Sequence, residues 1–424
     1  MKMSKVEKSW VMYDFANSAY ATIMVAAIFP VFFTQVCAGA GQAGDYWWGI
    51  GTSIATAIVA VMAPIVGTIA DFKGYKKKLW IAFLVLGLVF SLMNAIVDNW
   101  KLMLVGYVLS HVGFSGANLL NDSFLTDVTT PERMDTISSW AYALGYIGGS
   151  TIPFLMSIAL VMFGSHISVD SVMAVKLSLV IMVAWWGIFS IPFLRNVKQV
   201  HNIEKPEGNM LKEVFGGVWN TFKSMVAHKG IFVFVLAYFF YIDGVNTVIN
   251  MSTSYGSALG LDSTGMILAL MVTQIVAFPC SILFGRMSRK FGSIKMLLGA
   301  ISMYLVICIT GFVMGFGLEE GFLTMGQATV LFWTLAVMVG SVQGGIQAIS
   351  RSTFGKLVPP EKSGEYFGFF DIFGKFAAVI GPALYAFTHA VTGRSSFSIL
   401  SIIMLFLIAL LILGCGYKHI KDIE

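Results

Sequence analysis

The stretch Gly67–Lys78, GTIADFKGYKKK, lies between two long apolar runs of the chain. It returns in altered form at Gly285–Lys295, GRMSRKFGSIK, and the two copies align without a gap, so that Gly74 matches Gly292. A similar repeat follows further on, where Pro131-Glu132 matches Pro360-Glu361. The chain is therefore predicted to consist of two related halves, and internal repeats of this kind are typical of transporter folds.

The composition excludes a soluble protein. The chain has 424 residues, of which 57% are hydrophobic and only 12% charged. Soluble domains carry about 25% charged residues, so this deficit predicts a chain that lies in lipid. The four cysteines are scattered singly, without the spacing of a disulfide framework or a metal site. We therefore expect no metal, and we expect no cofactor. We also expect no nucleic-acid partner, because the basic residues behind the net charge of +5 are spread over many loops, where lipid headgroups are the more suitable partner.

Twelve apolar stretches are long enough to cross a bilayer, which takes about 20 helical residues. Helices are expected because lipid offers no partner for an unpaired backbone group. The predicted spans are 10–35, 46–70, 79–98, 102–126, 135–163, 173–194, 230–256, 262–284, 294–316, 324–350, 365–392 and 394–417. The fold class is therefore an all-α membrane protein of twelve transmembrane helices, arranged as two six-helix bundles.

Lysine and arginine indicate the orientation. Of the 27 such residues, all but Lys101, Lys176, Lys375 and Arg394 fall in segments on the side of the N-terminus. Positively charged loops stay in the cytoplasm, so both termini are predicted to be cytoplasmic, in a multi-pass protein of the cell (inner) membrane. Three parts follow: an N-terminal bundle at 1–194, a linker at 195–229 with an amphipathic helix, and a C-terminal bundle at 230–424.

The glycine-containing loop between the second and third spans resembles the signature loop of the major facilitator superfamily. Where the superfamily pattern has an arginine after the aspartate, this chain has Phe72, and the second copy has Arg289 in place of the aspartate. The run Trp10–Asn17, WVMYDFAN, and the segment from Gly374 to Pro382 resemble the vacuolar-effluxer-like (autophagy-related amino-acid effluxer) branch of that superfamily. The resemblance implies the major facilitator fold and a central cavity lined by helices 1, 4, 7 and 10.

The residues of the loop have distinct expected tasks. Gly67 allows close helix approach, and Gly74 permits the turn of a short connection. Asp71 would be stabilised by a helix N-terminus or by a basic partner. The resemblance implies that the loop, with Gly67, Asp71, Gly74 and Lys77, latches one conformation. The alternative is that its lysines only supply positive charge to the cytoplasmic side.

Polar side chains form stripes on the helices that the resemblance assigns to the cavity. Such stripes are costly against lipid, so we expect them to face water or one another. For the amides, hydrogen bonding between helices is the alternative to substrate contact, and for a single histidine it is an ordinary buried role. The candidate substrate-binding residues are Asn17, His111, Asn118, Asp243, Asn246, Asn250, Gln343, Gln347 and Lys375.

Asp243 is the central candidate because a carboxyl group near the middle of a span is by default functional. It would carry a proton or hold a cationic group of the substrate. Lys375 and Asp371 are four residues apart and can face each other on one helix. Their pair either stabilises two charges in the membrane or contacts the substrate.

The predicted function is secondary active transport of a small solute by alternating access, and the chain is not expected to be an enzyme. The family resemblance implies an amino acid or a similar amphipathic metabolite. A proton carried on Asp243 or His111 is a candidate for coupling, and we expect the working form to be a monomer. No nucleotide-binding loop is present in the sequence. The alternatives are a non-transporting receptor or assembly factor on a transporter scaffold, or an exporter of drug-like or lipid-like compounds.

Overall fold

The computed structural model describes residues 2–205 and 210–421, and within these residues twelve helices are long and apolar enough to cross a membrane. The twelve predicted spans are thereby confirmed. Six lie in the first half of the sequence: α1, η1 and α2 (Lys5–Tyr20, Ala21–Ala27, Ile28–Gly39), α3 (Gly44–Asp71), α4 (Lys76–Ile96), α5 (Trp100–Ser123), α7, η2 and α8 (Pro131–Leu144, Gly145–Thr151, Ile152–Phe163) and α9 (Ser171–Asn196).

The second half has one long helix for each span. These helices are α11 (Lys229–Ala258), α12 (Ser263–Phe291), α13 (Ser293–Glu319), α14 (Met325–Leu357), α15 (Ser363–Thr392) and α16 (Ser395–Gly416). Short elements complete the chain: α6 (Leu125–Val128), η3 (Gly164–Ile167), α10 (Met210–Ala227), η4 (Pro360–Lys362) and η5 (Tyr417–His419).

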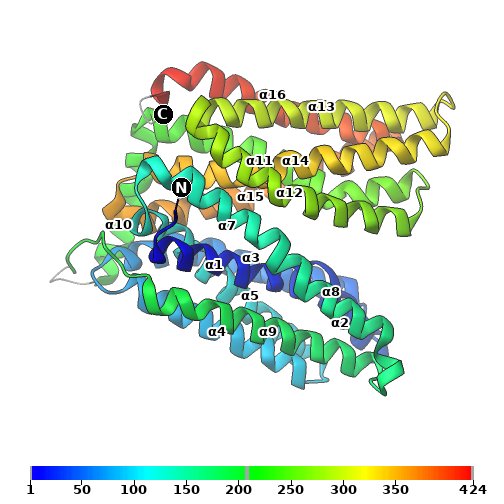
Figure 1. Cartoon of the computed structure of the whole chain (residues 1–424), viewed down its shortest axis with the longest axis horizontal. Helices are drawn as coiled ribbons and strands as arrows, with labels where there is room; N and C mark the ends of the chain where they lie inside the picture. The colour runs from blue at the N-terminus through cyan, green and yellow to red at the C-terminus, as the bar shows by residue number, and fades with distance from the viewer. Residues whose placement is uncertain (1, 206–209, 422–424) are drawn as a thin grey trace. The chain divides into compact units, whose positions relative to one another are not determined.

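The chain divides into two compact units. Unit 1 consists of Met1–Thr130, Leu144–Thr221 and Pro359–Phe369, and unit 2 of Pro131–Ala143, Phe222–Val358 and Phe370–Glu424. In unit 1, α4 packs against α5 and α9, and α3 packs against α5 (Figure 1). In unit 2, α13 packs against α14 and α16, and α12 packs against α14 (Figure 1). The predicted boundaries at 194 and 230 stay a prediction.

Close packing inside unit 1 depends on small residues. The first and fifth spans each contain a π-helical segment, η1 and η2, in the middle of an α-helix. A Cβ atom on Gly149 would lie 2.5 Å from Cβ of Ser18 and 2.6 Å from the carbonyl oxygen of Phe15. Glycine is therefore required for this helix contact, as small residues allow in membranes.

The amphipathic helix predicted in the linker is present as α10, whereas 206–209 lie outside the described residues. Several of its apolar side chains are exposed, with Phe215 at 59% and Trp219 at 57%, while Val214 and Met225 are buried. An exposed apolar face on a helix beside a membrane suits the headgroup plane. The spans show the same pattern, since Val61 is 68% and Leu411 66% exposed, which suits contact with lipid.

Candidate functional site

The carboxylate of Asp71 binds the beginning of another helix. Asp71 is the last residue of α3, is 1% exposed, and lies in unit 1 with the first residues of α15. Its Oδ1 accepts a hydrogen bond of 2.7 Å from the backbone N–H of Gly364, and its Oδ2 accepts one of 2.9 Å from Glu365. The first N–H groups of a helix have no partner within the helix and carry partial positive charge. A carboxylate is therefore well suited to this position.

Two glycines bring the two backbones together at this point. A Cβ atom on Gly67 would overlap the carbonyl oxygen of Gly364, and one on Gly364 would lie 2.6 Å from the carbonyl oxygen of Gly67. At the next residue of each helix, the hydroxyl of Thr68 donates to Oε1 of Glu365 at 3.0 Å. Any side chain at Gly67 would separate α3 from α15 and lengthen both bonds of Asp71.

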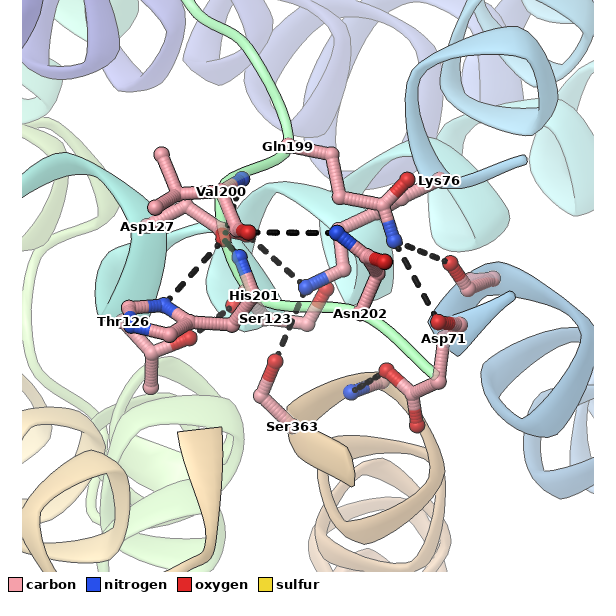
Figure 2. A network of polar contacts seen from close by, with 12 residues as sticks. Asp71, Lys76, Ser123, Thr126, Asp127, Gln199, Val200, His201, Asn202 and Ser363 are labelled. Carbon is pink, nitrogen blue, oxygen red and sulfur yellow. Dashed lines mark hydrogen bonds and ion pairs between the residues drawn. The ribbon is translucent and has the colours of Figure 1, made fainter. Parts of the chain in front are cut away.

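The loop after Asp71 carries a turn and a buried cation. Gly74 has a φ of +78°, a conformation that side chains disfavour. The Nζ atom of Lys76 is buried and donates to Oδ2 of Asp127 and to Oγ of Ser363, each at 2.9 Å (Figure 2). The predicted loop residue Lys77 donates instead to the carbonyl oxygen of Val197 at 2.7 Å.

Sequence reasoning missed Asp127 and Ser363, which share Lys76. Asp127 follows the end of the fourth span, in α6, and its side chain is fully buried. Their positions near the repeated Pro-Glu pair could have indicated them. Asp127 lies four residues before Pro131-Glu132, and Ser363 lies shortly after Pro360-Glu361. Both sites are therefore marked by the repeat, although no residue pattern indicated their partner.

The second copy of the loop makes the equivalent contact inside unit 2. A Cβ atom on Gly285 would lie 2.6 Å from Cβ of Ser139 and 3.0 Å from the carbonyl oxygen of Asp135, near the start of α7. In the two repeat alignments Gly285 matches Gly67, and Asp135 matches Gly364. Each copy of the loop thus packs closely against the start of a helix that follows the Pro-Glu pair.

The second copy uses a carboxylate from a different position, since Arg289 stands where the first copy has Asp71. In unit 2 the carboxylate comes from Asp135, which is 3% exposed. It accepts from Ser352 at 2.6 Å and Ser293 at 2.7 Å, and it pairs with Lys356 at 2.8 Å. In the repeat Lys356 matches Asp127, so the base of this pair stands where the first copy has an acid, whereas Asp135 matches Gly364.

Asp135→Asn is expected to destabilise the protein by about 3 kcal/mol, because it leaves the buried ammonium of Lys356 without its counter-charge. Asp71→Asn should cost less, since the Asp71 carboxylate binds backbone N–H groups and Asn keeps one acceptor. Thermal unfolding of the two purified variants in one detergent measures the order. Equal melting temperatures would contradict this account of Asp135.

Two of the candidate substrate residues meet in unit 1. The amide nitrogen of Asn17 on α1 donates to Oδ1 of Asn118 on α5 at 2.8 Å. Nearby, Asn121 donates to Asp14 at 3.1 Å. His111 lies on α5 beside the rings of Tyr107 and Phe114, at centroid distances of 5.7 Å and 6.3 Å. The amide pair joins two helices, as the structural alternative predicted, and its partly buried atoms leave acceptor and donor capacity for a solute.

In unit 2, Asp243 is fully buried on α11. Both of its carboxylate oxygens lie 2.9 Å from the backbone nitrogen of Gly381, in the middle of α15. The next residue is Pro382, which has no N–H and interrupts the ladder of helix hydrogen bonds. The hydroxyl of Thr247 donates back to the carbonyl oxygen of Asp243 at 2.7 Å. Asp243 thus links α11 to the point where proline weakens α15.

The remaining candidates of unit 2 fall into different environments. Lys375 pairs with Asp371 on α15, and both side chains are about one-quarter exposed. Asn246 is half-buried and Asn250 exposed, on the same side of α11 as Asp243. These positions form one polar side of α11, and Lys375 belongs to the helix that Asp243 contacts.

Gln343 of α14 lies near a different side of α11 from Asp243. Gln343 lines an apolar cavity of about 100 Å³, together with Ser252 of α11 and Gln274 of α12. Ser252 lies on the opposite side of α11 from Asp243, since nine residues at 100° each correspond to a half-turn. Gln347 lies one turn from Gln343 and is half-buried. The structure therefore does not bring Gln343 together with Asp243.

These features define a class of protein. In fold, the chain matches FucP, a major facilitator superfamily transporter crystallised in the outward conformation, with a TM-score of 0.69, 13% identity and coverage of 97% of this chain and 98% of that chain. In sequence, it is 43% identical over 420 residues to the MFS-type transporter YxiO of Bacillus subtilis (strain 168), covering 97% of this chain and 95% of that protein. The protein is a major facilitator superfamily transporter and not an enzyme.

A narrower relationship follows from residues 49–418, which match the family described as vacuole effluxer Atg22 like. The chain belongs to this family. It is also 25% identical over 299 residues to autophagy-related protein 22 of Cryptococcus neoformans var. neoformans serotype D (strain B-3501A), over 66% of this chain. The chain matches 52% of that relative's length, about half.

Proposed function

We propose that the protein transports a small amphipathic solute, foremost an amino acid, together with a proton that Asp243 carries. The observation that supports this proposal is the burial of the Asp243 carboxylate against the backbone of α15. An ionised carboxylate binds an N–H group more strongly than a neutral one does. Protonation of Asp243 would weaken its hold on Gly381, and the proline-interrupted helix could then change its bend.

This arrangement connects proton uptake to the loop through a single helix. Gly364, at the start of α15, binds Asp71, and Gly381, further along, binds Asp243. At 1.5 Å per residue the two points are ~25 Å apart along the helix axis. A bend of α15 at Pro382 would therefore be transmitted towards its N-terminus. The latch role of Gly67, Asp71, Gly74 and Lys77 is part of this proposal.

The amino-acid proposal rests on charge complementarity. Lys375 is partly exposed and its present partner is the carboxylate of Asp371. The carboxylate of a solute could take the place of Asp371, while an ammonium group would be held within the same unit by Asn246 or Asn250. The family name, vacuole effluxer, favours export over import.

The apolar cavity beside Gln343 supports a second candidate, an exporter of drug-like compounds. One experiment decides between the two. The purified protein is screened for thermal stabilisation by amino acids and by apolar cations, because a ligand that binds the folded state raises its melting temperature. The stabilising compounds are then tested for uptake into proteoliposomes with and without a pH gradient. If no stabilising compound is taken up, with or without the pH gradient, the result would favour a receptor over a transporter.

We place both termini in the cytoplasm and the protein in the cell membrane as a monomer. Gln42, before α3, and Gly326, at the start of α14, are exposed on the predicted outer side, and Gly216 is exposed in α10. In a Cys415→Ser background, Gln42→Cys and Gly326→Cys should react with an impermeant maleimide in intact cells, and Gly216→Cys only after lysis. Labelling of Gly216→Cys in intact cells would reverse the orientation.

A further inference from the structure

The segment that follows α9, Val197–Lys205, runs along the signature loop within unit 1. We propose that this segment, the linker strap, positions Asp71, and that Gln199 is the positioning residue. The proposal rests on the latch role proposed above. It makes the first part of the linker a component of the conformational loop, rather than a connection between two bundles.

Gln199 holds the end of α3 with both ends of its amide. Its Nε2 donates to the carbonyl oxygen of Ala70 at 3.0 Å, with longer contacts to the carbonyls of Asp71 and Phe72 (Figure 2). Its Oε1 accepts from the backbone N–H of Gly74 at 2.9 Å. The last carbonyl groups of a helix lack partners within the helix. Gln199 supplies that partner and also closes the turn that Gly74 makes.

Ile203 adds backbone contacts on the other side of the same turn. Its N–H donates to the carbonyl oxygen of Asp71 at 2.9 Å, and its own carbonyl accepts from the N–H of Lys73 at 3.0 Å. Asp71 is thus held twice. The strap binds its main chain, whereas α15 binds its side chain through Gly364 and Glu365.

The carboxylate of Asp127 binds the backbone of the strap. Its Oδ1 accepts from the backbone N–H groups of Val200 at 2.8 Å and His201 at 2.7 Å, while its Oδ2 binds Lys76 (Figure 2). One buried carboxylate therefore joins the strap to the loop. The strap has a defined place in the structure, and Gln199 is the side chain through which it reaches the end of α3.

The test uses hydrogen exchange at the N–H groups of Gly364 and Glu365, which Gln199 does not touch. If the strap positions Asp71, Gln199→Met should raise exchange there about tenfold, the effect of weakening a hydrogen bond by ~1.4 kcal/mol. Gln199→Glu keeps the acceptor for Gly74 but places a carboxylate oxygen against the carbonyl groups at the end of α3, so it should raise exchange at least as much. Glu204→Gln is the matched control, because the Lys73–Glu204 pair is exposed and contributes little.

The double variant with Asp71→Asn separates positioning from a local structural role. If Gln199 acts through Asp71, Gln199→Met should add no further exchange at Gly364 and Glu365 in the Asp71→Asn background. Unchanged exchange in Gln199→Met, or an equal increase in both backgrounds, would overturn the proposal. Hydrogen exchange needs no substrate, so this experiment tests the positioning role of Gln199 even if the proposed function is wrong.

Transport then tests the link to the cycle. Gln199→Met should lower the maximal uptake rate about tenfold and leave the KM within about twofold, because the strap lies at the loop and not at the polar side chains proposed to bind solute. A raised KM with an unchanged maximal rate would contradict a positioning role. Failure of the wild-type protein to transport any solute would count against the proposed function alone.

Discussion

Asp243→Asn is expected to abolish pH-driven accumulation of solute in proteoliposomes, while the protein still folds and inserts. The carboxylate is buried and binds the backbone N–H of Gly381 through both oxygens. Asparagine has nearly the same shape and keeps a neutral acceptor for that N–H group, so α11 and α15 should still pack together through a weaker hydrogen bond. It cannot bind and release a proton, so coupling should be lost.

The measurement has two parts. Uptake of labelled solute is followed with an imposed pH gradient, and exchange of labelled for unlabelled solute is followed without one. If Asp243 carries the proton, exchange should survive in Asp243→Asn; if it holds the ammonium group of the solute, exchange should be lost too.

The matched control is Asp262→Asn. Asp262 caps the start of α12 at an exposed position, and asparagine caps equally well. It should therefore leave transport unchanged. Full pH-driven accumulation by Asp243→Asn would show that Asp243 has a structural role, and the proposed proton site would have to be abandoned.

Asp71→Asn is expected to lower the maximal transport rate tenfold to a hundredfold and to leave solute affinity nearly unchanged. The carboxylate makes two hydrogen bonds to the first turn of α15, and asparagine can make only one as an acceptor. A hydrogen bond to a charged group contributes about 1.5–3 kcal/mol, and 1.4 kcal/mol corresponds to a factor of ten. The loss should fall on the conformation that contains this contact.

Solute affinity is measured by thermal shift, and the amount of folded protein by size-exclusion chromatography. Asp170→Asn is the control, since Asp170 caps the start of α9 at an exposed position and asparagine can cap in its place. If affinity in Asp71→Asn falls in proportion to rate, Asp71 contributes to binding and the latch role is wrong.

Gly67→Ala should lower the maximal transport rate in the same way, because its Cβ would overlap the carbonyl of Gly364.

The spans could be predicted because their signal is local. Length and hydropathy of a segment decide whether it can cross the bilayer, whatever its neighbours are. The glycines of the loop could also be predicted from the sequence around them. Gly67 and Gly74 are needed for a close approach and for a positive φ, and neither requirement depends on which segment approaches. Charge bias predicts orientation in the same local manner.

The partners of those residues could not be predicted in this way. Asp71 binds Gly364, which is far away in the sequence, through backbone groups that every residue possesses. A donor of that kind leaves no pattern in the residue types. Gln199 was missed for a related reason, since it binds carbonyl groups at the end of a helix and lies in a polar segment that reads as an ordinary connection.

The sequence by itself therefore determined the class of protein, its twelve membrane spans and the loop on which the proposed latch is built. Each of these depends on the residues of one short stretch of chain, either because the stretch lies in lipid or because it forms a turn. Only the tertiary structure decided that Asp135 binds Ser352 and Lys356, that Asp243 faces the backbone of α15, and that Gln343 lies by a separate cavity. These outcomes depend on which helix faces are brought together. Many pairings of apolar helices satisfy the same hydropathy, so the choice among them comes from side-chain packing across the whole bundle.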